Sequence, residues 1–185
     1  PPGLDWACDN GANVVSMSLG SPQPEAPLQA AIQRATAKGV FLIAAAGNTG
    51  RPQSVNYPAR WRETIAVAAV DRNGRLSRFS SRGPQVDIAA PGQDVLSTYR
   101  DGSYAKLSGT SMAAPFVAGV VALLIALHRD AKDARTPLRN LADLREHLRR
   151  TAREAGPIGH DPGYGWGLIN PDGLLCATAR REQCA

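Results

Sequence analysis

The stretch that decides both fold and chemistry is LSGTSMAAPFVAG, residues 107–119. It places Ser111 between a short polar loop and a long apolar run, 112–127, which predicts a helix. The run is shorter than the roughly 20 residues of a membrane span and contains Pro115 and Gly119, so we interpret it as a buried core helix. A hydroxyl in the first helical turn lies beside free backbone N–H groups and the positive end of the helix dipole. Both favour developing negative charge, which suits a nucleophile.

Working outward, strand and helix patterns alternate along the chain. The run 40–46 is continuously apolar, which is typical of a parallel strand covered on both faces. A strand, a helix and a second strand in this order make a right-handed crossover. The expected elements are a helix over 3–10, a strand over 13–19, a helix through Leu28, Ala31, Ile32 and Ala35 that ends at Gly39, strands over 40–46, 64–70, 86–89 and 95–98, a hairpin turn at 101–102 within 99–107, and a helix that begins at 136–137 and presents Leu138, Leu141, Leu144 and Leu148. These patterns predict one α/β domain.

Composition is that of an ordinary globular protein, with 43% hydrophobic and 20% charged residues and a formal net charge of +5. The densest run of arginines, within 145–153, alternates with acidic residues, which is typical of a solvated helix face and not of a nucleic-acid surface. Three cysteines leave one over, so no disulfide framework is implied. Cys176 and Cys184 are close enough in sequence to pair in an oxidising compartment, whereas Cys8 is interpreted as a small buried side chain.

Seven short motifs along the chain carry a family resemblance. GTSMAAP at 109–115 resembles the serine motif of the subtilisin-like serine proteases. The other motifs stand in the family's order and at about its spacing: SMSLG at 16–20, AAAGN at 44–48, YP at 57–58, FSSRGP at 79–84, APG at 90–92 and YGWGLIN at 164–170. The resemblance covers nearly the whole chain. It implies a three-layer α/β/α sandwich with a mostly parallel sheet, and a serine endopeptidase that acts on polypeptides.

The resemblance also implies roles for individual residues. Ser111 would be the nucleophile that forms an acyl-enzyme. Asn48 follows a strand at the carboxyl edge of the sheet and would donate its side-chain amide to the oxyanion hole, together with the backbone N–H of Ser111. An edge segment would pair with extended substrate, and small residues would wall an open pocket for large apolar side chains. The residues implied to bind substrate are Ser18, Leu19 and Gly20 at the edge, Ala45, Ala46 and Gly47 in the wall, and Asn56 near the floor.

A cation site and several partners follow from the same resemblance. Backbone carbonyls of Ala59, Trp61 and Thr64 with the carboxylate of Asp87 would form the family's weak site for calcium or a monovalent cation, because hard cations take oxygen ligands. Asp87 as a purely structural carboxylate fits the residues equally well. The chemistry itself needs no cofactor. The implied partners are a polypeptide substrate and the protein's own propeptide, with no nucleic acid, no membrane span and a monomeric intact protein.

Two groups of the expected catalytic triad are absent from the chain. Subtilisin itself has the triad in the order Asp, His, Ser. Here no histidine precedes Ser111, since the three histidines are His128, His147 and His160, and no Asp-Thr/Ser-Gly motif is present. We therefore expect residues 1–185 to be the C-terminal portion of one subtilase catalytic domain, missing its N-terminal strands. Such a piece would be inactive alone and would derive from an extracellular or periplasmic protease.

Two other readings compete with this one. A degenerate subtilase would bind peptides without cutting them, but the presence of both Ser111 and Asn48 argues against decay, because a protein without catalysis needs neither. An α/β-hydrolase would use Ser111 on a nucleophile elbow with Asp143 and His160. That fold needs a strong apolar strand directly before the serine, and 104–108 is short and polar.

Overall fold

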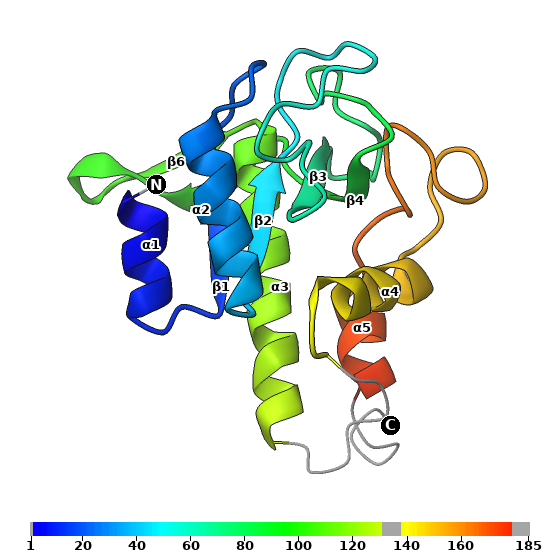
Figure 1. Cartoon of the computed structure of the whole chain (residues 1–185). Coiled ribbons are helices and arrows are strands. Elements are labelled where there is room, and N and C mark those ends of the chain that lie inside the picture. Colours follow the sequence, from blue (N-terminus) through cyan, green and yellow to red (C-terminus); the bar gives the residue numbers. More distant parts are fainter. Residues whose placement is uncertain (1, 131–137, 179–185) are drawn as a thin grey trace.

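A four-stranded parallel sheet organises the protein, which a computed structural model describes for residues 2–130 and 138–178 (Figure 1). Its strands are β1 (Val14–Met17), β2 (Phe41–Ala45), β3 (Ile65–Val70) and β4 (Val86–Pro91), in the spatial order β1-β2-β3-β4. Every residue of β2 and β3 is buried, as parallel strands covered on both faces require. The predicted strands are confirmed, each within one or two residues of its expected bounds.

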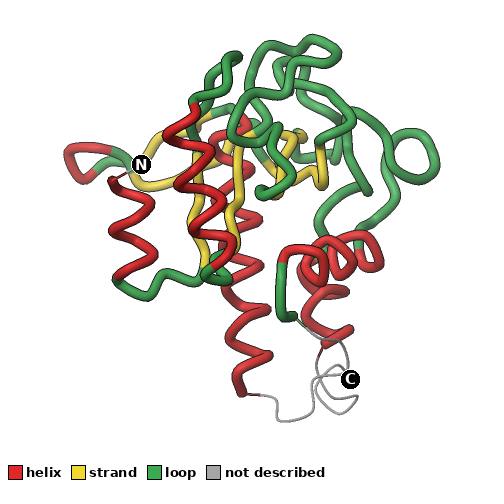
Figure 2. The backbone as a smooth tube through the Cα atoms, viewed as in Figure 1, coloured by secondary structure: helices red, strands yellow, loops and turns green. Residues whose placement is uncertain are grey.

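Side chains of the sheet alternate between two apolar layers. Ile43 and Ile65 point to one layer, which also contains α3 (Thr110–Asp130), α4 (Leu141–Thr151) and α5 (Pro171–Thr178). Leu42 and Ala66 point to the other, which contains α1 (Pro2–Asp9) and α2 (Ala26–Ala37). In Figures 1 and 2, α2 lies in front of the sheet and α3 behind it. The predicted three-layer α/β/α sandwich is therefore confirmed.

Helix α3 is the central packing element of one layer. It contacts all four strands of the sheet, and its residues Val117, Val121 and Leu124 are fully buried. Within the described part of the chain, this helix is long and apolar enough to cross a bilayer by composition. Its packing against the sheet instead confirms a core helix.

Two local features differ from expectation. Asn140 caps α4 by accepting hydrogen bonds from the N–H groups of Ala142 and Asp143, so the helix begins at Leu141 and Leu138 precedes it. Residues 136–137, from which a helix start was predicted, lie outside the described residues. Helix α5 was not predicted, because eight residues with only two large apolar side chains give too weak a periodicity.

An antiparallel hairpin connects the sheet to α3. Its strands are β5 (Val95–Thr98) and β6 (Tyr104–Leu107), and the short 3-10 turn η1 (Arg100–Gly102) joins them, with Asp101 in the left-handed region at φ 61°. The predicted turn at 101–102 is confirmed, and its first strand is 95–98. Because β6 is antiparallel and mostly exposed, it is not the buried parallel strand that an α/β-hydrolase elbow requires, which removes that reading.

The cysteines differ in state. Cys176 in α5 is disulfide-bonded, whereas Cys8 in α1 has a free thiol and is half-buried against the core. The predicted partner, Cys184, lies outside the described residues.

Candidate active site

The carboxyl ends of β1 and β2 meet the N-terminus of α3 at one edge of the sheet. Ser18 follows β1, Asn48 lies three residues beyond β2, and Ser111 is the second residue of α3. The structure brings these three residues together, because the Ser18 hydroxyl donates to the Ser111 carbonyl and the Asn48 side chain accepts from the N–H of Thr110, the residue before Ser111. Ser111 itself is half-buried and Asn48 is exposed, so the site opens to solvent.

Hydrogen bonds fix the direction of the Asn48 amide. Its Oδ1 accepts from the backbone N–H of Thr110 at 2.9 Å and from the Thr110 hydroxyl, also at 2.9 Å. An amide oxygen has two lone pairs, so these bonds occupy both of them, and within the described residues the Nδ2 donors have no partner. The side chain therefore presents N–H groups to the site and no oxygen.

The Asn48 amide lies near the backbone N–H of Ser111, on the two sides of Gly109. A Cβ added to Gly109 would lie 3.4 Å from Asn48 Nδ2 and 3.6 Å from the backbone N of Ser111. The two nitrogens are therefore close neighbours at the start of α3. A carbonyl oxygen that becomes negative in a reaction is stabilised by such a pre-oriented pair, with the dipole of α3 adding to the field.

Thr110 is the functional residue that sequence reasoning missed. It is buried, with 1% of its surface exposed, and besides bonding Asn48 its hydroxyl accepts from the N–H of Gly47 at 3.1 Å. One threonine therefore ties the loop after β2 to the first turn of α3. Its place directly before Ser111 was the available signal, but sequence alone does not reveal which partner a hydroxyl chooses.

Pro115 and Ser18 together set the start of α3. Pro115 lies inside the helix, and it has no N–H to donate to the carbonyl of Ser111 one turn earlier. The Ser18 hydroxyl donates to that carbonyl at 2.8 Å. Ser18, directly after β1, thus provides the donor that Pro115 lacks for the Ser111 carbonyl. This bond holds the predicted substrate-binding segment next to Ser111.

The predicted specificity residues gather around Asn56. A Cβ added to Gly47 would lie 3.0 Å from Asn56 Nδ2, and one added to Gly20 would lie 3.0 Å from the Asn56 Cβ. Both glycines thus let the backbone approach this side chain closely. Leu19, which directly precedes Gly20 in the edge segment, is 56% exposed. Ala45 and Ala46 are buried in the two core layers, so only their backbone can border a substrate pocket.

At the predicted cation site, an arginine from α4 fills the space between the expected ligands. Arg145 Nε donates to Asp87 Oδ1 at 2.8 Å, and Nη2 donates to the Thr64 carbonyl at 2.6 Å. The Trp61 carbonyl accepts from the hydroxyl and N–H of Thr64. Ala59 is buried beside them. The residues do not fit joint ligation of a cation by Asp87 and Thr64, because the guanidinium already supplies positive charge to both.

The described histidines have structural partners away from Ser111. His128 Nδ1 contacts the Leu124 carbonyl, and its ring lies edge-on to that of His147. His160 Nε2 contacts the Val86 carbonyl, 2.8 Å away. None of these contacts places a general base at Ser111.

Asp143, the carboxylate of the hydrolase reading, is also engaged elsewhere. The backbone N–H and the guanidinium of Arg139 hydrogen-bond to it and lower its pKa. No triad therefore forms around Ser111 from the residues that the structure describes.

Comparison with known proteins assigns the fold and site to a class. A sequence model of the subtilase family matches residues 2–167. A thermostable alkaline protease of Halalkalibacterium halodurans is 44% identical over 91% of this chain and 43% of its own length. Subtilisin Savinase of Lederbergia lenta is 43% identical over 92% of this chain and 59% of its own length. The chain belongs to the subtilase family.

Solved structures agree with this assignment. The prenylagaramide maturation protease PagA superposes with a TM-score of 0.83 at 30% identity, over 97% of this chain and 66% of that chain. The chain spans about half the length of the curated relatives it matches, at 43% and 59% of the two named above.

Proposed function

We propose that the protein containing this chain is a serine endopeptidase that cleaves polypeptides through an acyl-enzyme on Ser111. The Ser111 Oγ attacks the carbonyl carbon of the scissile bond, and its proton passes to a histidine base supplied from outside these 185 residues. The carbonyl electron pair moves onto oxygen. That oxyanion is held by Asn48 Nδ2 and the Ser111 N–H, after which the amine leaves with the transferred proton.

One observation carries this proposal above the others. The Asn48 amide oxygen is occupied by two bonds from Thr110, so the amide can only donate toward Ser111. This arrangement is what the transition state of acyl transfer needs.

The substrate would lie along the segment Ser18–Leu19–Gly20 and place a side chain toward Asn56. Backbone groups that follow an edge strand pair readily with an extended peptide. We also infer that the residues 1–185 alone have no peptidase activity, because Ser111 keeps its proton at neutral pH without a base.

We further propose an extracellular location. The disulfide at Cys176 supports it, because such bonds persist in oxidising compartments and are rare in the cytosol.

Covalent labelling tests the proposed function. The full-length protein is treated with a fluorophosphonate, and the modified peptide is identified by mass spectrometry. Modification at Ser111 with loss of peptidase activity is expected, and a Ser108→Ala variant should label as the wild type does. Peptide binding without labelling or cleavage would favour the degenerate subtilase, and labelling elsewhere with Ser111 unmodified would contradict the role of this residue.

A further inference from the structure

The guanidinium of Arg145 on α4 is bonded to oxygen atoms from two other segments of the chain. Its Nε donates to Asp87 Oδ1 at 2.8 Å, and its Nη2 lies 3.5 Å from Asp87 Oδ2. Nη2 also donates to the Thr64 carbonyl at 2.6 Å, and Nη1 donates to the Arg62 carbonyl at 2.9 Å. All three nitrogen atoms of the guanidinium thus face protein oxygens, at the place where the family resemblance implies a cation.

The sheet holds the Asp87 carboxylate in place independently of Arg145. The register of β3 and β4 shifts by one residue between Ala66 and Val67, and Asp87 is the residue that this shift leaves outside the ladder. Its Oδ2 accepts from the backbone N–H of Ala66 at 2.8 Å. The carboxylate is therefore fixed at the amino ends of both strands, and Oδ1 takes its partner from another layer.

The carbonyl of Thr64 needs a donor from within the protein. Thr64 is fully buried, and its hydroxyl donates to the carbonyls of Pro58 and Trp61, each at 3.0 Å. Buried backbone carbonyls in folded proteins are nearly always paired. Arg145 Nη2 supplies this pairing, so the turn that precedes β3 also depends on the guanidinium.

Arg145 also balances the charge of the cluster. Asp87 is largely buried, and its ion pair is with Arg145. Arg62 contributes only its carbonyl, because its own guanidinium is exposed and lies 3.2 Å from the Glu63 carboxylate. Removal of the Arg145 side chain leaves one negative charge beside the carbonyls of residues 62 and 64. Carboxylate and carbonyl oxygens together are the ligands that hard cations such as calcium take.

Solvent reaches this cluster through a cavity of about 380 Å³. Arg145 lines the cavity together with Arg62, Glu63 and Leu141. A cation that replaces the guanidinium therefore has an entry path, and it has room for the water molecules that complete its coordination shell.

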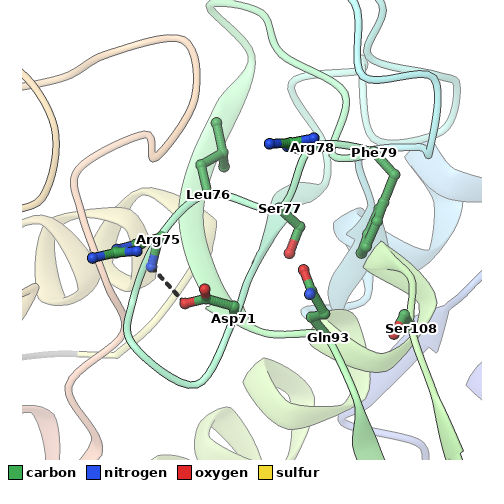
Figure 3. Close-up of a pocket in the computed structure, with 8 residues that line it drawn as sticks. All are labelled: Asp71, Arg75, Leu76, Ser77, Arg78, Phe79, Gln93 and Ser108. Carbon is green, nitrogen blue, oxygen red and sulfur yellow. Dashed lines mark hydrogen bonds between the residues drawn. The ribbon is translucent and has the colours of Figure 1, made fainter.

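Two arginines of the turn 71–79 lack such contacts. In Figure 3 the side chains of Arg75 and Arg78 extend away from Gln93, and neither forms an ion pair within residues 2–130 and 138–178. The carboxylate of this turn, Asp71, accepts from two backbone N–H groups, one of them drawn in Figure 3, and these bonds lower its pKa. Backbone donors thus suffice for that exposed carboxylate, and Arg145 differs from these arginines in its fixed place.

We propose that the Arg145 guanidinium takes the place of a structural cation in this protein. The amino ends of β3 and β4 are stabilised without a metal ion, and loss of the guanidinium turns the same oxygens into a calcium site. With a single carboxylate this site is weak, with a Kd of about 1 mM. The inference concerns stability and does not depend on the proposed peptidase function.

Thermal unfolding of the full-length protein tests this inference. Arg145→Met removes the charge and keeps an apolar stem. Each protein is unfolded with calcium chloride, and again with a chelator and choline chloride at equal ionic strength. At a calcium concentration of about ten times Kd, the folding equilibrium constant of Arg145→Met rises by a factor of about 11. Calcium should therefore raise the Tm of this variant by about 3 °C more than that of the wild type. Calcium sites elsewhere in the protein affect both alike and cancel in this difference.

Three further variants locate the effect. Arg145→Lys keeps a positive charge and should respond to calcium as the wild type does. Arg78→Met removes an arginine that forms no ion pair with the described residues, and it should also respond as the wild type does. The double variant Arg145→Met/Asp87→Asn lacks the carboxylate, so it should lose the added response.

Equal calcium responses in the wild type and Arg145→Met would overturn the proposal. An added response that persists in the double variant would also overturn it, because the ion would then bind elsewhere. A measurement on the wild type does not require any variant to fold. Crystals of the full-length protein soaked in terbium chloride should show no anomalous peak at Asp87, and a terbium ion bound there in place of the guanidinium would contradict the proposal.

Discussion

Asn48 lies just beyond the carboxyl end of β2, and Asp87 lies at the amino end of β4. Both side chains accept hydrogen bonds from distant parts of the chain. At Asp87 each oxygen has a donor, with Ala66 N–H on Oδ2 and Arg145 on Oδ1, each at 2.8 Å. At Asn48, among the residues that the structure describes, only the oxygen is bonded and the Nδ2 donors have no partner. Both carboxylate oxygens of Asp87 are therefore hydrogen-bonded within the fold, whereas Asn48 keeps N–H donors that a reacting group can use.

The difference teaches how a fold separates stability from function. A buried charge without partners is costly, so Arg145 completes the Asp87 cluster from a helix 58 residues further along the chain. An exposed amide costs little when part of it is unpaired, because water can solvate it. Substitution at the two sites should therefore affect different properties.

The largest effect is expected on catalysis. In the full-length protein, Asn48→Ala removes a donor aimed at charge present mainly in the transition state, so kcat should fall with little change in KM. Removal of one such donor in a subtilisin costs about 10²–10³ in kcat, and we expect the same order here. Kinetics on a peptide ester measure kcat and KM, and urea unfolding measures stability, which should not change. A change confined to KM would mean that Asn48 only shapes the pocket.

The next effect is expected on stability. Arg145→Ala leaves Asp87, which is 13% exposed in its side chain, without its charged partner. Arg145 itself is 31% exposed, so we expect a loss of about 2 kcal/mol in the free energy of unfolding, below the range for a fully buried pair. Urea unfolding measures it. Arg149→Ala, which breaks the exposed pair with Glu146 and the contact with the Trp166 ring, should lower the unfolding midpoint less than Arg145→Ala does. Equal midpoints for both variants would contradict a structural role for Arg145.

The smallest effect is expected at Ser18. Ser18→Ala leaves the Ser111 carbonyl, freed by Pro115, to water, which should cost about 0.5–1 kcal/mol of stability. We expect kcat to fall only a few-fold, because the start of α3 keeps its other contacts. Ser21→Ala, a matched loss of a hydroxyl in the neighbouring turn, serves as the control in the same assays. No difference between the two variants would mean that the Ser18 bond does not hold the nucleophile.

Sequence reasoning reached the parts of the molecule whose causes are local. Continuous apolar runs identified the buried strands, because local composition determines them, and the roles expected of Ser111 and Asn48 came from the resemblance of two short motifs to those of a known family. It missed Thr110 and Arg145, whose roles depend on partners 62 and 58 residues away. Hydrogen-bond partners at such separation are fixed by packing of the layers, which no pattern in one segment encodes.

The expected cation site at Asp87 also depends on a partner from a distant segment, which sequence reasoning did not place there. The Thr64 carbonyl and the carboxylate of Asp87 lie close enough for one guanidinium to bond both, and the Trp61 carbonyl accepts from the Thr64 hydroxyl. The guanidinium that joins Asp87 to Thr64 comes from α4, where the sequence showed only a solvated arginine-rich face. A charged side chain on such a face can snorkel into a buried cluster while its neighbours stay in water.

The most direct test of the pre-oriented amide is a double-mutant cycle between Asn48 and Thr110. Thr110→Ala removes one of the two hydrogen bonds that orient the Asn48 amide and leaves the backbone one, so kcat should fall roughly tenfold, whereas Thr110→Ser keeps the hydroxyl and most of the activity. Because Thr110 acts through Asn48, the double variant Asn48→Ala/Thr110→Ala should have a kcat within about twofold of Asn48→Ala alone. If the two losses multiply instead, Thr110 acts independently and does not orient the oxyanion donor.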